Sequence, residues 1–427
     1  MSPHAFRCPD YSVRFRYKVL IFLGVVAVIT YLDRVCIAVA GPRMQHDLDL
    51  SPSDWGWVVG IFAFAYAVFE IPTGSLADHY GPRRILTRIV LWWSVFTSLT
   101  GFASAFWILL AIRFLFGVGE AGAFPNFSSA ISKWFPPAGR ARALGIVIMM
   151  TQLGGALSPL LVVPLQARYG WRTSFYLFGV LGVLWSLFWF RWYRDKPAEM
   201  PGISQAELAE LPAPPPSTHR PLPWTIALRS GNFWLYLLQG FAYYYVGFFF
   251  VSWLQTYLVK GRGFVEKQLL LSALPFLFAA AGNFAGGFAS DALVRRYGLR
   301  WGRRIAGSIG GGLGATAMTA GILISNPYAS LICLAFAYSG VGFIQPTAFA
   351  VSIDIAPLHA GSIAGAMNTA AQAGGFVSSI AFGYLVKLSG GYTIPLIPMV
   401  VAFTISALTW LRIDATRPLD ASAASNG

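Results

Sequence analysis

Twelve apolar segments of about 20 residues recur along this chain, and no other feature restricts its fold as strongly. A helix of that length is about 30 Å long, which matches the hydrocarbon thickness of a lipid bilayer. The segments lie at 18–40, 55–77, 85–105, 107–130, 143–166, 172–192, 232–258, 269–292, 305–325, 328–350, 362–387 and 392–412. We therefore predict an all-α membrane protein with twelve transmembrane helices.

The low content of charged side chains agrees with a lipid-facing surface. Only 11% of the residues are charged and 56% are hydrophobic, whereas a soluble domain has about 25% charged residues. The net charge of +14 raises the question of nucleic acid, but a nucleic-acid partner requires basic residues gathered on one soluble face. Here they stand in short loops between apolar segments. We expect the bilayer as the partner and no nucleic acid.

The distribution of Lys and Arg between alternate loops predicts the orientation of the chain. With the N-terminus in the cytoplasm, the cytoplasmic segments hold 22 of the 31 basic residues and the outer loops hold seven. The remaining two, Arg34 and Arg113, fall inside apolar segments. We expect a multi-pass protein of a bacterial inner membrane with both termini in the cytoplasm.

One long polar connection separates the first six apolar segments from the last six. It is rich in proline and has no apolar period, which is typical of a linker. We expect a cytoplasmic tail at 1–17, a six-helix bundle at 18–192, a cytoplasmic linker at 193–228, a second six-helix bundle at 229–413 and a cytoplasmic tail at 414–427.

A short motif occurs once in each half. The first copy follows the second apolar segment and contains Gly74, Asp78, Gly81, Arg83 and Arg84. The second copy follows the eighth segment and contains Gly287, Asp291, Gly298, Arg303 and Arg304. Because each half has six segments in the same orientation, the two halves are predicted to be parallel repeats about an axis along the membrane normal.

The motif has a mechanical interpretation. Its glycines permit a tight turn and a close approach of two helices. Its aspartate ends a helix where an arginine or the N-terminus of a neighbouring helix can hold it. Such a contact can favour one access state of a transporter over the other. We therefore predict a gating role for Gly74, Asp78, Gly81, Arg83, Arg84 and Asp291.

With this motif and the repeated halves, the chain resembles the major facilitator superfamily. Two further stretches resemble its anion:cation symporter branch, namely Tyr31 to Arg34 in the first segment and Arg113 to Pro125 in the fourth. The resemblance implies that Asp33 and Glu120 take up protons. It also implies that Arg34 meets the carboxylate of the substrate and that Arg113 pairs with Asp33.

The depths of these charges agree with such roles. A charge at the bilayer centre costs about 2.5–3.5 kcal/mol, so charges on two segments must face each other or a water-filled cavity. Helical rise places Asp33 and Arg113 at a similar depth and Glu120 two turns further in. This predicts an Asp33–Arg113 pair, leaves Arg34 as a free cation and leaves Glu120 as a lone carboxylate, which burial favours in its protonated form. The alternative is a structural role, in which ion pairs only hold the two helices together.

Neutral polar residues are the other candidates for the substrate cavity. Asn368 matches a position that contacts substrate hydroxyl groups in the family, and for each of these residues helix packing is an alternative role. Glu70 stands where the family has a neutral amide, so it is either a second proton site or a solvated residue. The predicted substrate-binding residues are Arg34, Arg113, Tyr31, Tyr66, Gln152, Tyr243, Asn368 and Gln372.

These features predict a secondary active transporter that carries a small organic anion, such as a sugar acid or another carboxylate, together with protons by alternating access. One alternative is a proton-driven exporter of amphipathic compounds, although two arginines inside the bundle argue against it. Another is a nutrient sensor that has a carrier fold but does not transport. An enzyme is not expected, because all five histidines fall in tails or loops. We expect a monomer with no cofactor and no metal.

Overall fold

The computed structural model describes residues 14–211, 224–357 and 359–419, and within these ranges it is helical without a strand. The first half contains α1 (Phe15–Asp47), α2 (Pro52–Thr100), α3 (Phe106–Glu120), α4 (Ala123–Trp134), α5 (Pro137–Tyr169) and α6 (Trp171–Trp192). The connection contains η1 (Pro197–Glu199), α7 (Gln205–Ala209) and α8 (Trp224–Arg229). The second half contains α9 (Gly231–Ser252), α10 (Leu254–Thr256), η2 (Tyr257–Gly261), η3 (Glu266–Ser272), α11 (Ala273–Leu323), α12 (Pro327–Ile355), α13 (Ala360–Ser389), η4 (Ile394–Leu396) and α14 (Ile397–Trp410). The predicted all-α membrane fold is confirmed.

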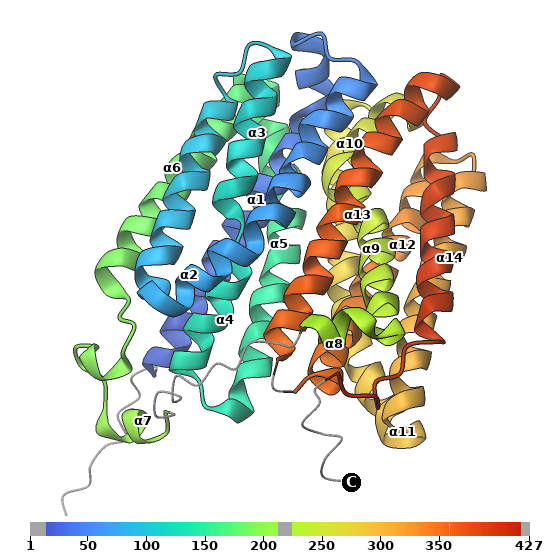
Figure 1. Cartoon of the computed structure of the whole chain (residues 1–427). Coiled ribbons are helices and arrows are strands. Elements are labelled where there is room, and N and C mark those ends of the chain that lie inside the picture. The colour runs from blue at the N-terminus through green and yellow to red at the C-terminus, as the bar shows by residue number, and fades with distance from the viewer. Residues whose placement is uncertain (1–13, 212–223, 358, 420–427) are drawn as a thin grey trace, which may run out of the picture.

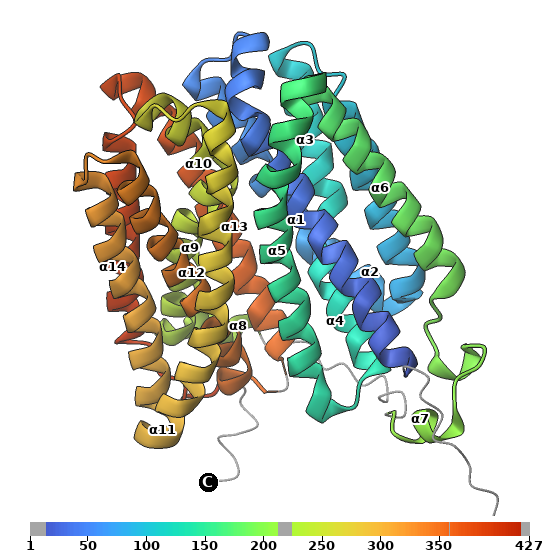
Figure 2. The same cartoon turned by 180° about the vertical axis from the view of Figure 1, so that it is seen from behind.

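The helices form two groups that follow the order of the chain. In Figure 1 the helices α1 to α6 lie on the left and the helices α9 to α14 on the right, and Figure 2 shows the same division from behind. The two groups meet where α2 packs against α13 and where α5 packs against α11.

Two helices reverse direction at a glycine. As one straight rod, the 49 residues of α2 would extend about 74 Å. Instead, Arg172 donates to the carbonyl of Ala103 at 3.3 Å and Trp171 donates to Asp47 at 2.9 Å, so the chain before α2 and the chain after it lie at the same end. The reversal occurs at Gly81, whose φ of 78° and ψ of 150° suit only glycine.

The second half repeats this reversal in α11. The non-helical residue is Gly298, with φ of 77° and ψ of 167°. Gln268 lies before α11 and Tyr328 after it, and their side chains form a hydrogen bond of 2.6 Å. Both glycines belong to the repeated motif, so the turn that the motif predicts is present in each half.

Seven of the described helices are long and apolar enough to cross a membrane. These seven do not include α2, α13 or α14, and two helices, α2 and α11, each pass the bundle twice. We count α3 with α4 as one crossing and α9 with η2 as one crossing. Each half then has six crossings, and the total of twelve is consistent with the number predicted from the sequence.

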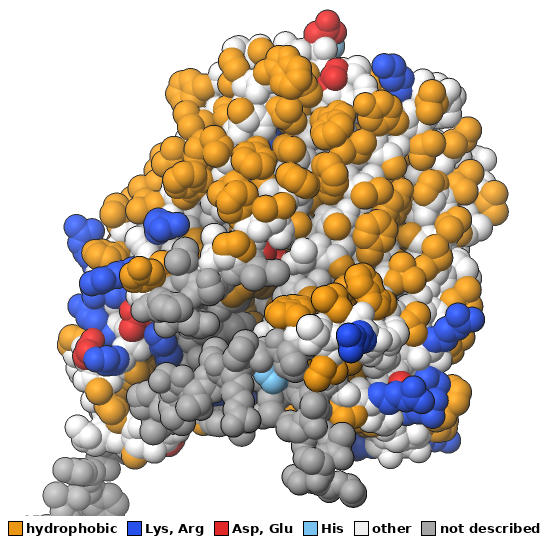
Figure 3. Space-filling model, viewed as in Figure 1, with side chains coloured by type: hydrophobic (Ala, Val, Ile, Leu, Met, Phe, Trp, Pro, Cys, Tyr) orange, Lys and Arg blue, Asp and Glu red, His pale blue; other side chains and the backbone are white. Residues whose placement is uncertain are grey.

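The two ends of the bundle differ in charge. We call them the Gly81 end, where α2 reverses direction, and the Arg43 end, where α1 ends; α7 lies on the side of the Gly81 end, at the bottom of Figure 1. Figure 3 shows Lys and Arg side chains gathered toward the Gly81 end, below a broad band of hydrophobic side chains. This is the distribution expected of a protein whose middle faces lipid.

The connection between the halves is ordered in part and holds the start of α1. The carboxylate of Glu207 in α7 accepts hydrogen bonds from the backbone amides of Phe15 at 3.1 Å and Arg16 at 3.0 Å. These are the first amides of α1, which have no partner within the helix. Glu207 therefore caps α1 from a position almost 200 residues later in the chain.

Candidate functional site

Four charged side chains are buried in the middle of the first half. Asp33 and Arg34 are adjacent in α1, and Arg113 and Glu120 belong to α3; none is more than 5% exposed. The helix breaks directly after Glu120, because α3 ends there and Gly122 adopts a φ of 88° before α4 begins. The carboxylate of Glu120 thus lies at a break in a membrane helix.

Arg34 and Glu120 form a buried ion pair. The Nε atom of Arg34 donates to Oε1 of Glu120 at 2.5 Å, and their side chains are 5% and 1% exposed. The sequence-based expectation of a free Arg34 and a lone Glu120 is therefore wrong. It relied on depth along each helix, which does not specify the direction in which a long side chain extends.

Asp33 does not form the predicted pair with Arg113. No ion pair joins these two residues in the part of the chain that the structure describes; Asp33 Oδ2 instead accepts a hydrogen bond of 3.4 Å from Thr97 of α2, and Oδ1 has no partner. Adjacent residues of a helix point about 100° apart. Asp33 therefore faces the part of α2 that follows Gly81, while Arg34 extends toward α3 and the part of α2 that precedes Gly81.

The two guanidinium groups share an aromatic surface and keep unused donors. The guanidinium carbons of Arg34 and Arg113 each lie 5.1 Å from the ring centre of Phe62. Arg34 also lies 5.3 Å from the ring of Tyr31 and 4.9 Å from that of Tyr66. Nη2 of Arg34 and Nε of Arg113 have no hydrogen-bond partner in the protein. Buried guanidinium groups with free N–H groups can donate hydrogen bonds to an anion.

A small cavity lies beside these guanidinium groups. Its volume is about 10 Å³, which is enough for about one water molecule. The cavity is therefore too small for an organic anion unless the helices around it move apart. The lining residues are Tyr31, Arg34, Ile37, Val59, Phe62, Arg113, Tyr244, Phe248, Val251 and Ser252.

None of the five other predicted substrate residues lines this cavity. Tyr66 lies beside Arg34, and its hydroxyl group has no partner. Gln152 and Gln372 are buried, and the side-chain oxygen of each is also unpaired. Tyr243 is buried against Tyr244. Asn368 does not line the described cavity, because its side-chain amide donates to Glu70 at 2.5 Å.

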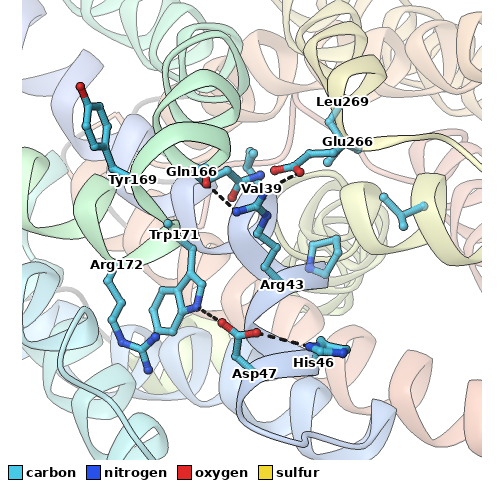
Figure 4. Close-up of a pocket in the computed structure, with 13 residues that line it drawn as sticks. Val39, Arg43, His46, Asp47, Gln166, Tyr169, Trp171, Arg172, Glu266 and Leu269 are labelled. Carbon is cyan, nitrogen blue, oxygen red and sulfur yellow. Dashed lines mark hydrogen bonds and ion pairs between the residues drawn. The ribbon is translucent and has the colours of Figure 1, made fainter.

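The Arg43 end is closed by contacts between the halves. Arg43 of α1 donates to Glu266 of η3 across the interface at 2.5 Å, and within the first half it donates to the carbonyl of Gln166 of α5 at 2.5 Å. Figure 4 shows both contacts. Gln45 of α1 donates to Thr256 at 2.9 Å and accepts from Lys260 at 3.0 Å.

A pocket of about 500 Å³ lies at this end and is bounded in part by the Arg43 contacts. Figure 4 also shows Asp47 accepting from Trp171 and contacting His46 on the pocket wall. The pocket therefore does not include Arg34 or Arg113. The contacts that close the Arg43 end separate it from the small cavity beside those two arginines.

At the Gly81 end, the first motif is held by an aspartate that the sequence did not single out. The carboxylate of Asp195, just after α6, accepts from the backbone amide of Arg83 at 3.1 Å and from Lys133 at 3.4 Å. Arg83 also donates through Nε to the carbonyl of Phe190 at 2.9 Å, whereas Arg84 is exposed. Gly74 and Asp78, two further residues of the motif, lie outside the residues whose surroundings are described.

In the second motif, Arg303 lies between two carboxylates. It contacts Asp291 at 3.6 Å and Asp354 of α12 at 2.9 Å. Its Nη1 atom also donates to Ser290 at 2.8 Å. All of these residues belong to the second half, so in this conformation Asp291 contacts its own half.

Comparison with known proteins identifies the family. The sequence profile of the Major Facilitator Superfamily matches residues 23–379. The chain belongs to the major facilitator superfamily. Superfamily members similar to it include a probable sulfoacetate transporter of Cupriavidus necator, which is 32% identical over 96% of each chain. A hexuronate transporter of Bacillus subtilis is 31% identical over 88% of this chain and 90% of its own length. A D-galactonate transporter of Escherichia coli is 30% identical over 93% and 95%.

The fold agrees with a solved structure of a superfamily member. A bacterial homologue of the human lysosomal transporter Spinster, in an inward-facing and occupied conformation, superposes with a TM-score of 0.76 at 20% identity. The superposition covers 94% of this chain and 97% of that one. The family match and the relatives, which are all transporters, make this protein a multi-pass membrane transporter and not an enzyme.

Several residues of the site were missed by sequence analysis. Phe62 has a signal that could have found it, because Phe62, Tyr66 and Glu70 are spaced at i, i+4 and i+8 and therefore share one face of α2. Thr97 and Phe248 carry no comparable signal. Glu266 and Asp195 lie in short connecting stretches, where sequence spacing does not indicate a partner.

Proposed function

We propose that this protein is a proton-coupled symporter of a small organic anion. The observation that supports the proposal is the buried Arg34–Glu120 ion pair beside Arg113, with unused guanidinium donors on both arginines. A carboxylate or sulfonate group is the natural partner of such donors, because its oxygens accept two N–H bonds from one guanidinium. The relatives named for sulfoacetate, hexuronate and D-galactonate carry anions of this kind.

The ion pair also suggests how proton and anion binding are coupled. While Glu120 is ionised, it occupies Arg34 and opposes the entry of a second anion. When Glu120 takes up a proton, its hold on Arg34 weakens and the guanidinium becomes available to the substrate. Proton and anion therefore bind together, and the two together carry less negative charge than the anion alone. Asp33, whose Oδ1 atom has no partner, is a second proton acceptor beside this site.

We further propose that the Gly81 end faces the cytoplasm and that residues 18–192 and 229–413 move relative to each other as two bodies. The gathering of Lys and Arg at the Gly81 end supports this orientation. It places both termini in the cytoplasm of a bacterial cell, and it makes the closed Arg43 end the outer one. Asp78 and the arginines of its motif are proposed to stabilise the opposite closure.

The experiment is uptake of radiolabelled anion into proteoliposomes that contain the purified protein. Sulfoacetate, D-glucuronate and D-galactonate are the probes, each supplied with and without an inward pH gradient. We expect the gradient to drive accumulation of at least one probe, and a protonophore to abolish it. Accumulation that is insensitive to the protonophore and collapses without sodium would contradict proton coupling.

A matched variant tests the role of the ion pair. Glu120→Gln should eliminate gradient-driven accumulation and retain exchange of internal for external anion, because the neutral amide no longer titrates. Binding of a probe without any flux would instead indicate a sensor. Gradient-driven loss of amphipathic cations, with no flux of any anion, would indicate an exporter.

A further inference from the structure

Glu70 is a buried carboxylate that the proposed transport cycle does not yet use. It lies in α2 on the same face as Phe62 and Tyr66, and it is only 4% exposed. Asp33 and Glu120 have roles in the proposed function, but they lie on α1 and α3, within the first half. Glu70 lies instead at the contact of α2 with α13, where the two halves meet.

The contacts of Glu70 join the two halves. Its Oε1 atom accepts a hydrogen bond of 2.5 Å from the side-chain amide of Asn368 in α13. Its Oε2 atom is buried and has no hydrogen-bond partner. Among the described residues, no ion pair reaches Glu70. One carboxylate oxygen is thus bound across the interface, and the other is left without a donor.

The surroundings of Glu70 supply little positive charge. The titratable groups that interact with it are Arg34 of α1, Tyr66 of its own helix and Tyr243 of α9. Arg34 is already paired with Glu120. The helices α3, α4, α6 and α13 pack against α2, and within the described residues they provide no further charged partner for Glu70.

An ionised carboxylate in this position is costly. Burial of a charge without a counter-ion is far more expensive than burial of a neutral carboxylic acid, and one neutral amide compensates only part of that cost. The neutral acid accepts from Asn368 at Oε1, and its O–H group at Oε2, which has no partner, costs less than an unpaired buried charge. Contact between α2 and α13 therefore favours the acid, whereas separation of the helices admits water and favours the anion.

We propose that Glu70 is a third proton-binding carboxylate that holds its proton while α2 and α13 are in contact and releases it to water when they separate. The O–H bond of the acid breaks, water accepts the proton, and the carboxylate that remains is solvated. In the direction of the proposed function, with the Gly81 end in the cytoplasm, Glu70 takes up a proton from water on the outer side and releases it on the cytoplasmic side, so it carries one proton inward per cycle. That direction rests on the proposed function, but the proton site itself does not.

Infrared difference spectroscopy tests the site without any substrate. Purified protein is titrated with base, and the carbonyl band of protonated carboxylic acids is followed. We expect a band that is lost on titration in the wild type and is absent from Glu70→Gln, separate from the bands removed by Asp33→Asn and Glu120→Gln. Asn368→Ala should keep the band at a shifted frequency, because the acid loses its hydrogen bond. Glu199→Gln, in the connection between the halves and 55% exposed, is the control and should leave the band unchanged.

Accumulation in proteoliposomes tests whether the proton is carried. At a pH gradient of one unit and no membrane potential, each coupled proton multiplies the equilibrium accumulation by about ten. With sulfoacetate as the probe, Glu70→Gln should still accumulate it, at a level about tenfold below the wild type.

The outcomes separate this proposal from the proposed function. If Glu70→Gln keeps every carboxylic acid band, Glu70 is ionised in the closed state and the proposal fails. If the band is lost but the accumulation is equal to that of the wild type, the proton is bound but not carried, and the transport role fails. If the wild type itself accumulates no probe, the proposed function fails, and the spectra still decide whether Glu70 binds a proton.

Discussion

Arg43 of α1 and Glu266 of η3 form an ion pair of 2.5 Å that connects the two halves at one end of the bundle. Their side chains are 36% and 32% exposed, and an ion pair in such a position contributes about 0.2–1 kcal/mol. Contacts with so small a free energy hold the Arg43 end closed but do not prevent it from opening. A carrier that opens and closes once per cycle requires contacts that break readily.

Removal of this ion pair should open the Arg43 end more often. Glu266→Ala is expected to raise the population of the open state up to about fivefold, which corresponds to the upper limit of 1 kcal/mol for an exposed pair. The measurement is the labelling rate of a cysteine introduced at Val59, which lines the small cavity, by a reagent added from the Arg43 side. The charge exchange Arg43→Glu with Glu266→Arg should restore slow labelling, and Glu199→Ala should have no effect. Equal labelling in Glu266→Ala and wild type would refute a gating role.

Arg34 should be the principal anchor of the anion. Arg34→Lys keeps the positive charge but loses the planar pair of donors, so we expect the affinity for the preferred probe to fall about tenfold or more. Isothermal calorimetry of the purified protein measures this change. Arg113→Lys is the matched control and should cause a smaller loss. If Arg34→Ala binds the anion as tightly as the wild type, Arg113 is the anchor instead.

The two reversing glycines allow backbone strain to be separated from crowding. Gly81 and Gly298 have nearly the same φ, but a Cβ atom on Gly81 would lie 2.6 Å from the carboxylate of Asp195, whereas one on Gly298 would meet nothing within 4 Å. Gly298→Ala should therefore lower the stability by about 1–3 kcal/mol through strain alone. Gly81→Ala should lower it further.

Thermal unfolding in detergent measures both glycine effects. Gly312→Ala is the control, because Gly312 lies inside α11 with open space around it, and alanine is favoured over glycine in a helix by about 1 kcal/mol. Equal losses of stability in Gly81→Ala and Gly298→Ala would show that the side chain of Asp195 moves away from the new methyl group without cost.

Loss of the cap on α1 should destabilise the first half. Glu207→Ala leaves the amides of Phe15 and Arg16 without their acceptor, at a cost of about 1 kcal/mol. Glu210→Ala removes a neighbouring carboxylate that is 43% exposed and should cost less. The midpoint of thermal unfolding is the measurement, and identical midpoints for the two variants would contradict the capping role.

Sequence reasoning located the helices and the turns of this protein but not its long-range pairs. The length of each apolar segment, compared with the thickness of a bilayer, shows where each crossing lies. The backbone conformation at position 81 is one that only glycine adopts readily, so the motif glycine indicates the turn. The partner of Arg34 was not predictable in the same way. Depth along a helix follows from rise per residue, whereas Glu120 is 86 residues away and its pairing depends on how two helices are rotated.

The partner of Glu70 was also not predictable from the sequence. The sequence left it as either a proton site or a solvated group, and its burial excludes the second choice. Its partner, Asn368, is 298 residues away on the other half. No local pattern connects two such residues, because their contact exists only once both halves are packed.

The cap that Glu207 provides has a consequence for biogenesis. The first amides of α1 emerge from the ribosome 192 residues before the carboxylate that will satisfy them. At 5–20 residues per second, that interval is roughly 10–40 s. During this time α1 to α6 must enter the membrane with the start of α1 frayed and in contact with water or lipid headgroups. Synthesis of the connection therefore completes the first half, and a chain truncated after α6 should insert but remain sensitive to proteases at its N-terminal edge.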